Sequence, residues 1–183
     1  GGVTSCFASS NTAYGVLCGT SMSAPTVTGI SALLLQDYCA QFPARCPGGN
    51  NPDMRNSTLK ILLAHTAVDL GNVGPDYQFG YGSVRIQTAI DFMRTGRFLE
   101  GSVSQNGVFS IFVVVNPGAP QLKVTLAWDD PPGTPNVSPA LINDLDIVVI
   151  DPSNNQRFPW TLGGLANPAA AATPPPGRTP ALP

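Results

Sequence analysis

A seven-residue stretch of small, uncharged residues organises this chain. Residues 19–25 read Gly-Thr-Ser-Met-Ser-Ala-Pro. They follow a short apolar strand predicted over 14–18 and precede an apolar run, residues 26–38, that predicts a buried helix packed on a sheet. A Gly turn, a Ser at a helix start and Pro25 in the first helical turn complete this unit, because the missing proline N–H has no intrahelical use there. Ser21 is therefore expected at the positive end of a helix, where backbone N–H groups point outward.

This placement suits a nucleophile. A serine hydroxyl there can attack a carbonyl carbon, and its own backbone N–H can help to hold the resulting oxyanion. The alternative is that Ser21 is only an N-cap, a position where Ser is strongly preferred.

The stretch resembles the nucleophile motif of the subtilisin-like serine proteases (subtilases), Gly-Thr-Ser-Met-Ala-x-Pro, with Ser23 in place of the usual Ala. The resemblance implies that Ser21 is the nucleophile and that its backbone N–H is an oxyanion donor. It also implies a supporting motif around the nucleophile, formed by Gly19, Thr20, Met22 and Pro25.

Two later segments fit the same family in the same order. Residues 62–71 are similar to its Leu-Leu-x-x-Thr-Ala-x-x-Leu-Gly segment, in a helix predicted over 51–65. Residues 79–84 (Phe-Gly-Tyr-Gly-Ser-Val) and a short helix over 86–93 resemble the end of the subtilase catalytic domain. The resemblance therefore covers residues 1–95 and implies the C-terminal part of an α/β, three-layer domain with a parallel sheet.

His65 is the only histidine of the chain, and it falls on a variable position of the family's segment. We therefore interpret it as a helix-end histidine that interacts with the last carbonyl groups, and not as a catalytic base.

A serine hydroxyl needs a base to take its proton. In the family, the Asp and His lie in Asp-Ser/Thr-Gly and His-Gly-Thr-His patterns before the nucleophile, as does an oxyanion-hole Asn, and neither pattern occurs in these 183 residues. The resemblance thus implies a serine endopeptidase that acts on polypeptides through an acyl-enzyme, with the Asp and His upstream of Gly1. The chain begins without Met, so we expect a fragment that is inactive alone and is completed by the upstream part of the same domain.

Two alternatives belong to other functional classes. One is a catalytically dead subtilase relative that acts as a binding or structural module. The other is a structural β-sandwich with a chance match at Ser21, which the order of three matching segments disfavours.

From about residue 95 the hydrophobic pattern changes to a period of two. Residues 108–115 are apolar on both faces, whereas residues 122–128 alternate. With further short strands predicted over 145–150 and 157–161, this pattern favours an all-β antiparallel sandwich.

Residues 126–133 and 141–147 resemble the C-terminal jelly-roll domain of some bacterial alkaline subtilases, which is similar to the P domain of kexin-like proteases. Four or five strands are fewer than the eight of a jelly roll, so we predict a partial domain over residues 96–162. The Ala- and Pro-rich tail, residues 163–183, is expected to be extended or disordered.

An acidic cluster in this second region could supply oxygen ligands to a structural calcium ion. Its members are Asp129, Asp130, Asp144 and Asp146, with Asn143 beside them. The alternative is that these residues cap turns and face water. The chemistry itself requires no cofactor.

Charge and cysteine content restrict the partners and the compartment. Only 11% of residues are charged and the net charge is −2, which gives no electrostatic case for nucleic acid. No apolar run approaches the roughly 20 residues that span a bilayer. Cys39 and Cys46 bracket a short loop that a disulfide could close, whereas Cys6 and Cys18 either pair or leave Cys18 a buried thiol. These features, with the resemblance, predict a secreted protein.

Overall fold

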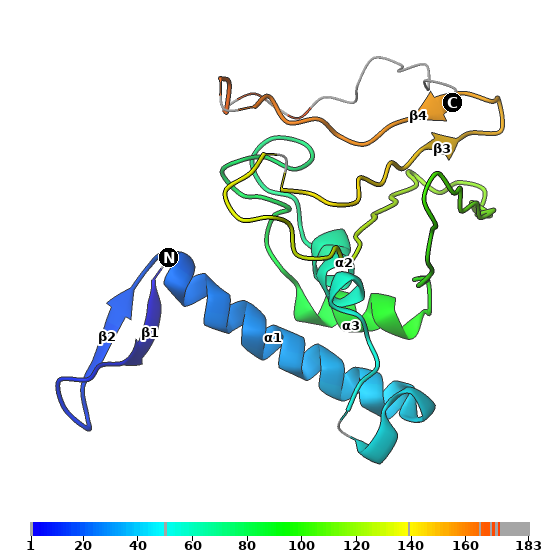
Figure 1. Ribbon diagram of the computed structural model, residues 1–183. Helices are drawn as coiled ribbons and strands as arrows, with labels where there is room; N and C mark the ends of the chain where they lie inside the picture. The colour runs from blue at the N-terminus through cyan, green and yellow to red at the C-terminus, as the bar shows by residue number, and fades with distance from the viewer. Residues whose placement is uncertain are drawn as a thin grey trace. The chain divides into compact units, whose positions relative to one another are not determined.

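The computed structural model describes residues 2–49, 51–138, 140–164, 166–168, 170 and 172. Its secondary structure is labelled in Figure 1. The chain divides into two compact units, Gly1–Asp53 and Met54–Pro183, and each is described by itself. The division predicted from the sequence, at residue 95, stays a prediction.

The first unit begins with a β-hairpin. Strands β1 (Val3–Cys6) and β2 (Tyr14–Leu17) pair antiparallel, with Val3 opposite Leu17 and Cys6 opposite Tyr14. This register puts Cys6 and Cys18 at opposite ends of the ladder, about 13 Å apart at the usual rise per residue. A disulfide cannot bridge that distance. Both thiols are free and exposed, so neither alternative expected for Cys18 is correct.

Helix α1 (Thr20–Gln41) confirms the helix predicted after the serine, and it begins earlier than the apolar run suggested. Pro25 was expected in the first turn, and this is wrong, because the helix already starts at Thr20 and Pro25 lies inside it. The proline consequently deprives the Ser21 carbonyl of the N–H that an α-helix normally supplies from four residues ahead. Of the residues of α1, Leu34 and Tyr38 are buried, whereas Leu33 is 53% exposed.

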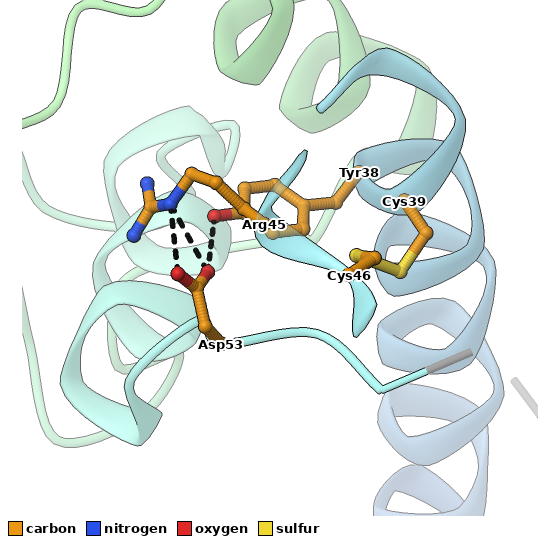
Figure 2. Close-up of a disulfide and its surroundings, with 5 residues drawn as sticks. All are labelled: Tyr38, Cys39, Arg45, Cys46 and Asp53. Carbon is orange, nitrogen blue, oxygen red and sulfur yellow. Dashed lines mark hydrogen bonds and ion pairs between the residues drawn. A yellow bond between two sulfur atoms is a disulfide. The ribbon is translucent and has the colours of Figure 1, made fainter. Parts of the chain in front are cut away.

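The C-terminal end of α1 is held by a disulfide and a polar cluster (Figure 2). Cys39 and Cys46 are bonded, with their Cα atoms 5.3 Å apart, as the short loop between them suggested. Within this loop lies the 3₁₀ turn η1 (Pro43–Arg45), and η2 (Pro47–Gly49) follows the second cysteine. The Tyr38 hydroxyl donates to Asp53 at 2.9 Å, and Arg45 forms an ion pair with the same carboxylate at 3.0 Å.

Asp53 thereby becomes the acceptor that ties residues 45–53 back to the helix. Partial burial would raise the pKa of its carboxyl, but the hydrogen bonds from Tyr38 and Arg45 outweigh it and hold that pKa below its ordinary value.

The second unit is built on helices α2 (Asn56–Thr66) and α3 (Ile86–Arg94), both predicted from the sequence. Their core includes the fully buried side chains of Leu62, Ala89 and Met93. Helix α2 begins five residues later than predicted, because Arg55 before it is still extended, with φ −69° and ψ 152°.

The connection between α2 and α3 is folded around a carboxylate that the sequence analysis did not single out. Asp76 is 6% exposed and accepts backbone N–H groups from Asn72, Gln78 and Phe79. The hydrogen bond from the Phe79 N–H is the main reason why the pKa of the Asp76 carboxyl is lowered. Reciprocal backbone bonds between Val68 and Ser83 close the loop.

The C-terminal region differs from the strand prediction. Among the described residues it contains one small antiparallel sheet, β3 (Val149–Ile150) with β4 (Gln156–Arg157). Residues 108–115 and 122–128 lie in no strand of the described part, and Phe112 is fully exposed. A strand needs the backbone of a neighbour to complete its hydrogen bonds, and no such neighbour is present there in the described residues. The jelly-roll sandwich stays a prediction.

Two further expectations concern the C-terminal tail and membrane-spanning segments. Most of the predicted tail, residues 173–183, lies outside the described residues. None of the described helices is both long and apolar enough to cross a membrane.

Candidate active site

Ser21 is the second residue of α1, directly after the hairpin strand and the turn at Gly19. Gly19 has φ +138°, a conformation that side chains disfavour, which allows the chain to pass sharply from β2 into the helix. Met22 and Ser23 donate their N–H groups to the Gly19 carbonyl at 3.1 and 3.2 Å. Among the described residues, the Ser21 N–H has no backbone acceptor, so it points outward at the positive end of the helix.

The Ser21 side chain differs from four other hydroxyl groups on the same helix. Ser23, Thr26, Thr28 and Ser31 each donate their hydroxyl to the carbonyl four residues earlier, at 2.8–3.4 Å. Ser21 is exposed, and within the described part of the chain its Oγ makes no hydrogen bond. It caps no N–H group there, so the N-cap interpretation is not what this geometry shows. The hydroxyl is accessible to an incoming group.

An apolar hollow is lined in part by Met22, the residue that follows Ser21. Its lining comes from the β1–β2 hairpin, with Phe7 and Leu17, and from Met22 of α1. Met22 of the predicted motif therefore connects the helix start to the hairpin surface.

Unit Gly1–Asp53 places no base beside Ser21 among its described residues. Its two acidic side chains are Asp37 and Asp53. Asp37 lies sixteen residues further along α1, about 24 Å away at the helical rise. Asp53 is bonded to Tyr38, near the same far end of the helix. A general base must come within hydrogen-bond reach of the proton it takes, so these carboxylates do not supply it.

His65 is engaged elsewhere, in the last turn of α2. Its Nδ1 lies 2.9 Å from the Thr125 hydroxyl, and its ring packs on Phe92 of α3 with centroids 4.6 Å apart. The interaction with helix-end carbonyls expected for His65 belongs instead to Lys123, whose Nζ donates to the His65 carbonyl at 2.6 Å. Burial, and secondly the Lys123 charge, lower the pKa of His65.

Two of the four carboxylates considered for calcium, Asp129 and Asp130, take part in hydrogen bonds. Asp129 accepts the Ser57 N–H and hydroxyl at 3.1 and 3.0 Å, and Asp130 accepts backbone N–H groups of Ile142 and Asn143. The bond from Ile142 is the main reason why the pKa of Asp130 is lowered. The oxygen atoms of Asp129 and Asp130 thus already accept N–H and O–H donors.

Within the described ranges, no three His, Cys, Asp or Glu side chains gather as a metal site would require. Asp129, Asp130, Asp144 and Asp146 are therefore not gathered as a metal site in the part of the chain that the structure describes, and we derive no step through a metal. Calcium binding stays a prediction from the sequence.

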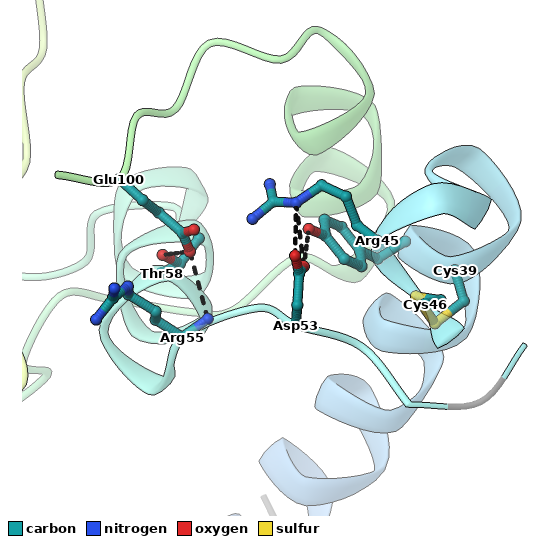
Figure 3. A network of polar contacts seen from close by, with 8 residues as sticks. Cys39, Arg45, Cys46, Asp53, Arg55, Thr58 and Glu100 are labelled. Carbon is teal, nitrogen blue, oxygen red and sulfur yellow. Dashed lines mark hydrogen bonds and ion pairs between the residues drawn. A yellow bond between two sulfur atoms is a disulfide. The ribbon is translucent and has the colours of Figure 1, made fainter. Parts of the chain in front are cut away.

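Sequence reasoning missed a role of Asp129 and Glu100 at the start of α2. Glu100 accepts the Arg55 N–H at 3.3 Å and also the Thr58 hydroxyl (Figure 3). No local signal could have revealed these contacts, because the partners are 42 to 72 residues apart in the chain. The buried Asp76 did have a local signal, since an Asp that begins a Gly-containing loop often bonds to the next N–H groups.

Comparison with known proteins finds a family to which part of this chain is similar. Residues 3–82 match the model of the subtilase family. An extracellular serine protease of Serratia marcescens is 37% identical over 81 residues, 44% of this chain and 6% of that protein. Fervidolysin of Fervidobacterium pennivorans is 33% identical over 118 residues, 61% of this chain and 14% of its own length.

A third relative is the autotransporter lipoprotein NalP of Neisseria meningitidis serogroup B, 46% identical over 66 residues, 36% of this chain and 5% of that protein. No solved structure matches. The chain thus spans 5–14% of the length of these three relatives.

The residues that match the family model include β1, β2, α1 and α2. The match ends at residue 82, within the loop that Ser83 closes and before α3. It does not extend to the predicted jelly roll. The resemblance inferred from residues 19–25 is therefore confirmed for residues 3–82, a segment that is similar to subtilases and carries Ser21 at the start of α1.

Proposed function

We propose that this chain is the nucleophile-bearing part of a secreted serine endopeptidase. One observation carries the proposal: inside the segment that matches the subtilase family, Ser21 stands exposed at the N-terminus of a 22-residue helix. Neither its Oγ nor its backbone N–H is satisfied by another described group. Those are the two atoms that an acyl-transfer reaction would use.

The proposed mechanism begins when a base removes the Ser21 proton and Oγ attacks the carbonyl carbon of a peptide bond. The Ser21 N–H, supported by the positive helix end, donates to the oxyanion that forms. Collapse of this intermediate breaks the C–N bond, and the base returns its proton to the departing amine. Water then hydrolyses the acyl-enzyme by the same route and frees Oγ.

The base and its partner must come from outside these residues. We propose that an Asp, a His and an oxyanion-hole Asn lie upstream of Gly1, in the order the family resemblance implies. The names of the relatives, an extracellular serine protease and an autotransporter lipoprotein, support a secreted endopeptidase. The Cys39–Cys46 disulfide also favours an oxidising compartment.

One observation favours a second candidate. Within unit Gly1–Asp53 the described residues place no base beside Ser21, and the single histidine, in the other unit, contacts Thr125 and Phe92. A relative without the upstream Asp or His would keep this fold and act as a binding or structural module.

The test is substitution of Ser21 in the longest protein that carries this chain. We expect Ser21→Ala to lower kcat/KM on a peptide substrate by at least about 10⁴-fold, since the nucleophile is removed. Ser23→Ala is the matched control, because Ser23 only donates to the Gly19 carbonyl. A fluorophosphonate probe should label the wild type and Ser23→Ala, but not Ser21→Ala.

Two outcomes would count against the proposal. If Ser21→Ala keeps its activity, the nucleophile is another group. If the wild-type protein neither cleaves peptides nor takes up the probe, the binding-module candidate is favoured. The 183-residue piece alone should be inert, and Ser21-dependent ester hydrolysis by it would refute an upstream base.

A further inference from the structure

Helix α2 lacks its own capping groups at both ends. Its N-cap residue, Arg55, makes no side-chain capping bond, and its first turn contains no acidic residue. The C-cap residue is Ala67 in an extended conformation, so no glycine of the usual left-handed cap closes the helix. The free N–H and C=O groups of this helix must find partners elsewhere.

At the N-terminal end, two carboxylates from later in the chain supply the acceptors. Glu100 accepts the Arg55 N–H and the Thr58 hydroxyl (Figure 3), while Asp129 accepts the N–H and hydroxyl of Ser57. Ser57 and Thr58 are buried, at 7% and 3% exposure. Each carboxylate thus takes one backbone and one hydroxyl donor, at a place where water reaches the hydroxyl partners poorly.

At the C-terminal end, the same later segment supplies the opposite charge. Lys123 donates to the His65 carbonyl at 2.6 Å, and Thr125 lies 2.9 Å from His65 Nδ1. Negative groups therefore meet the positive helix end and a positive group meets the negative end, which is the favourable sense for the helix dipole. Residues 122–130 therefore contact both ends of α2, through Asp129 at the start of the helix and Lys123 at its end.

We infer that α2 is a docking surface for residues 98–130 of the same chain, which grip it at both ends through Glu100, Lys123, Thr125 and Asp129. We call this set the α2 clamp. It joins a helix inside the family-matched segment to a segment beyond that match. Residues 98–130 are consequently a structural part of the α2–α3 unit, and not an appendage that folds separately after residue 95. This inference does not depend on peptidase activity.

The first experiment measures hydrogen exchange by mass spectrometry on the full chain. Asp129→Asn removes the charge while keeping the side-chain shape. We expect exchange in the two overlapping peptides that cover the first turn of α2 to accelerate roughly 10-fold, as loss of a charged hydrogen bond would produce. Asp146→Asn is the matched control, because Asp146 is an exposed carboxylate for which no hydrogen bond occurs in the described part. It should leave both peptides unchanged.

A double-mutant cycle tests the specific contact. If Asp129 acts through Ser57, then Ser57→Ala should add little to the effect of Asp129→Asn. Lys123→Met provides an independent reading at the other end of the helix, because this exposed side chain can change without emptying the core. It should accelerate exchange in peptides covering the last turn of α2 while α3 keeps its protection.

Additive effects in the cycle would overturn the inference. So would equal effects of Asp129→Asn and Asp146→Asn, or unchanged exchange at the end of α2 that each clamp variant contacts. None of these readouts involves peptide cleavage, so failure of the clamp is distinguishable from failure of the proposed function.

Discussion

At the residue scale, His65 shows how a single side chain can mislead. A lone histidine downstream of Ser21 invites assignment as a catalytic base, and the family's segment argued against it. In the structure, the histidine ring is half-buried and lies between Phe92 and Thr125, beside the Lys123 ammonium group. Its lowered pKa is therefore a consequence of packing and of the neighbouring cation.

This environment predicts a measurable titration. Because His65 is the only histidine, a single pair of imidazole NMR signals reports it. We expect a midpoint below the ordinary value of 6.5. Lys123→Met should raise the midpoint, yet leave it below 6.5, because burial is the larger cause. Lys60→Met, on the same helix, is the control and should not shift it.

The same shift fixes the sign of a pH effect on stability. The folded state binds the His65 proton less readily than the unfolded state. Its contribution is therefore fully present above pH 6.5 and is lost as the pH falls from there through the lowered pKa. A midpoint at or above 6.5, or an equal shift in Lys60→Met, would contradict this account.

At the element scale, local sequence patterns predicted the three α-helices, whose formation depends largely on the residues within them. The apolar run after Ser21 and the periodicities before His65 and Met93 gave α1, α2 and α3. The start of α2 was misplaced, because its capping partners, Glu100 and Asp129, are far away in sequence. Strand β1 was missed for a similar reason, since its identity depends on pairing with β2.

The site shows the same division. The position of Ser21 near the start of a helix could be predicted from a contiguous heptapeptide, whereas its catalytic role stays a proposal. The strands predicted over 108–115 and 122–128 could not be verified in this way. Apolar alternation gives a segment the capacity to pair, but the partner decides whether a ladder forms.

The Gly-x-Gly turn before α3 offers an element-scale prediction. A methyl group added at Gly82, where φ is +101°, would lie 2.0 Å from the Val68 carbonyl oxygen. Gly80 has φ +61° but open space around the added group. We expect Gly80→Ala to lower the free energy of unfolding by about 1–2 kcal/mol, the backbone cost alone, and Gly82→Ala by about 2–5 kcal/mol.

Urea unfolding measures both changes, and hydrogen exchange localises them. Only Gly82→Ala should expose the Val68 and Ser83 amides, whose mutual bonds of 2.9 and 2.8 Å close the loop. If the two variants lose the same stability, the close approach at Gly82 does not matter energetically.

At the scale of the whole molecule, the first unit leaves an unusual amount of apolar surface uncovered. Val16 and Leu17 of the hairpin and Leu33 of α1 are 48–65% exposed. The chain corresponds to 5–14% of the length of its relatives. With 11% charged residues, little charge is available to keep such surfaces apart in solution.

Two adjacent leucines of α1 allow this to be tested. Leu33 is 53% exposed, whereas Leu34 is fully buried. We predict that the 183-residue chain, produced alone, associates through its apolar surface, and that Leu33→Glu reduces the association while changing stability by no more than about 0.5 kcal/mol. Leu34→Glu places the same charge in the core and should cost at least about 3 kcal/mol.

Sedimentation velocity reports association, and circular dichroism during urea unfolding reports stability. If Leu33→Glu unfolds the chain as Leu34→Glu does, then Leu33 is part of the core of the isolated chain. If Leu33→Glu leaves the association unchanged, the exposed face of α1 is not the surface through which the chain associates.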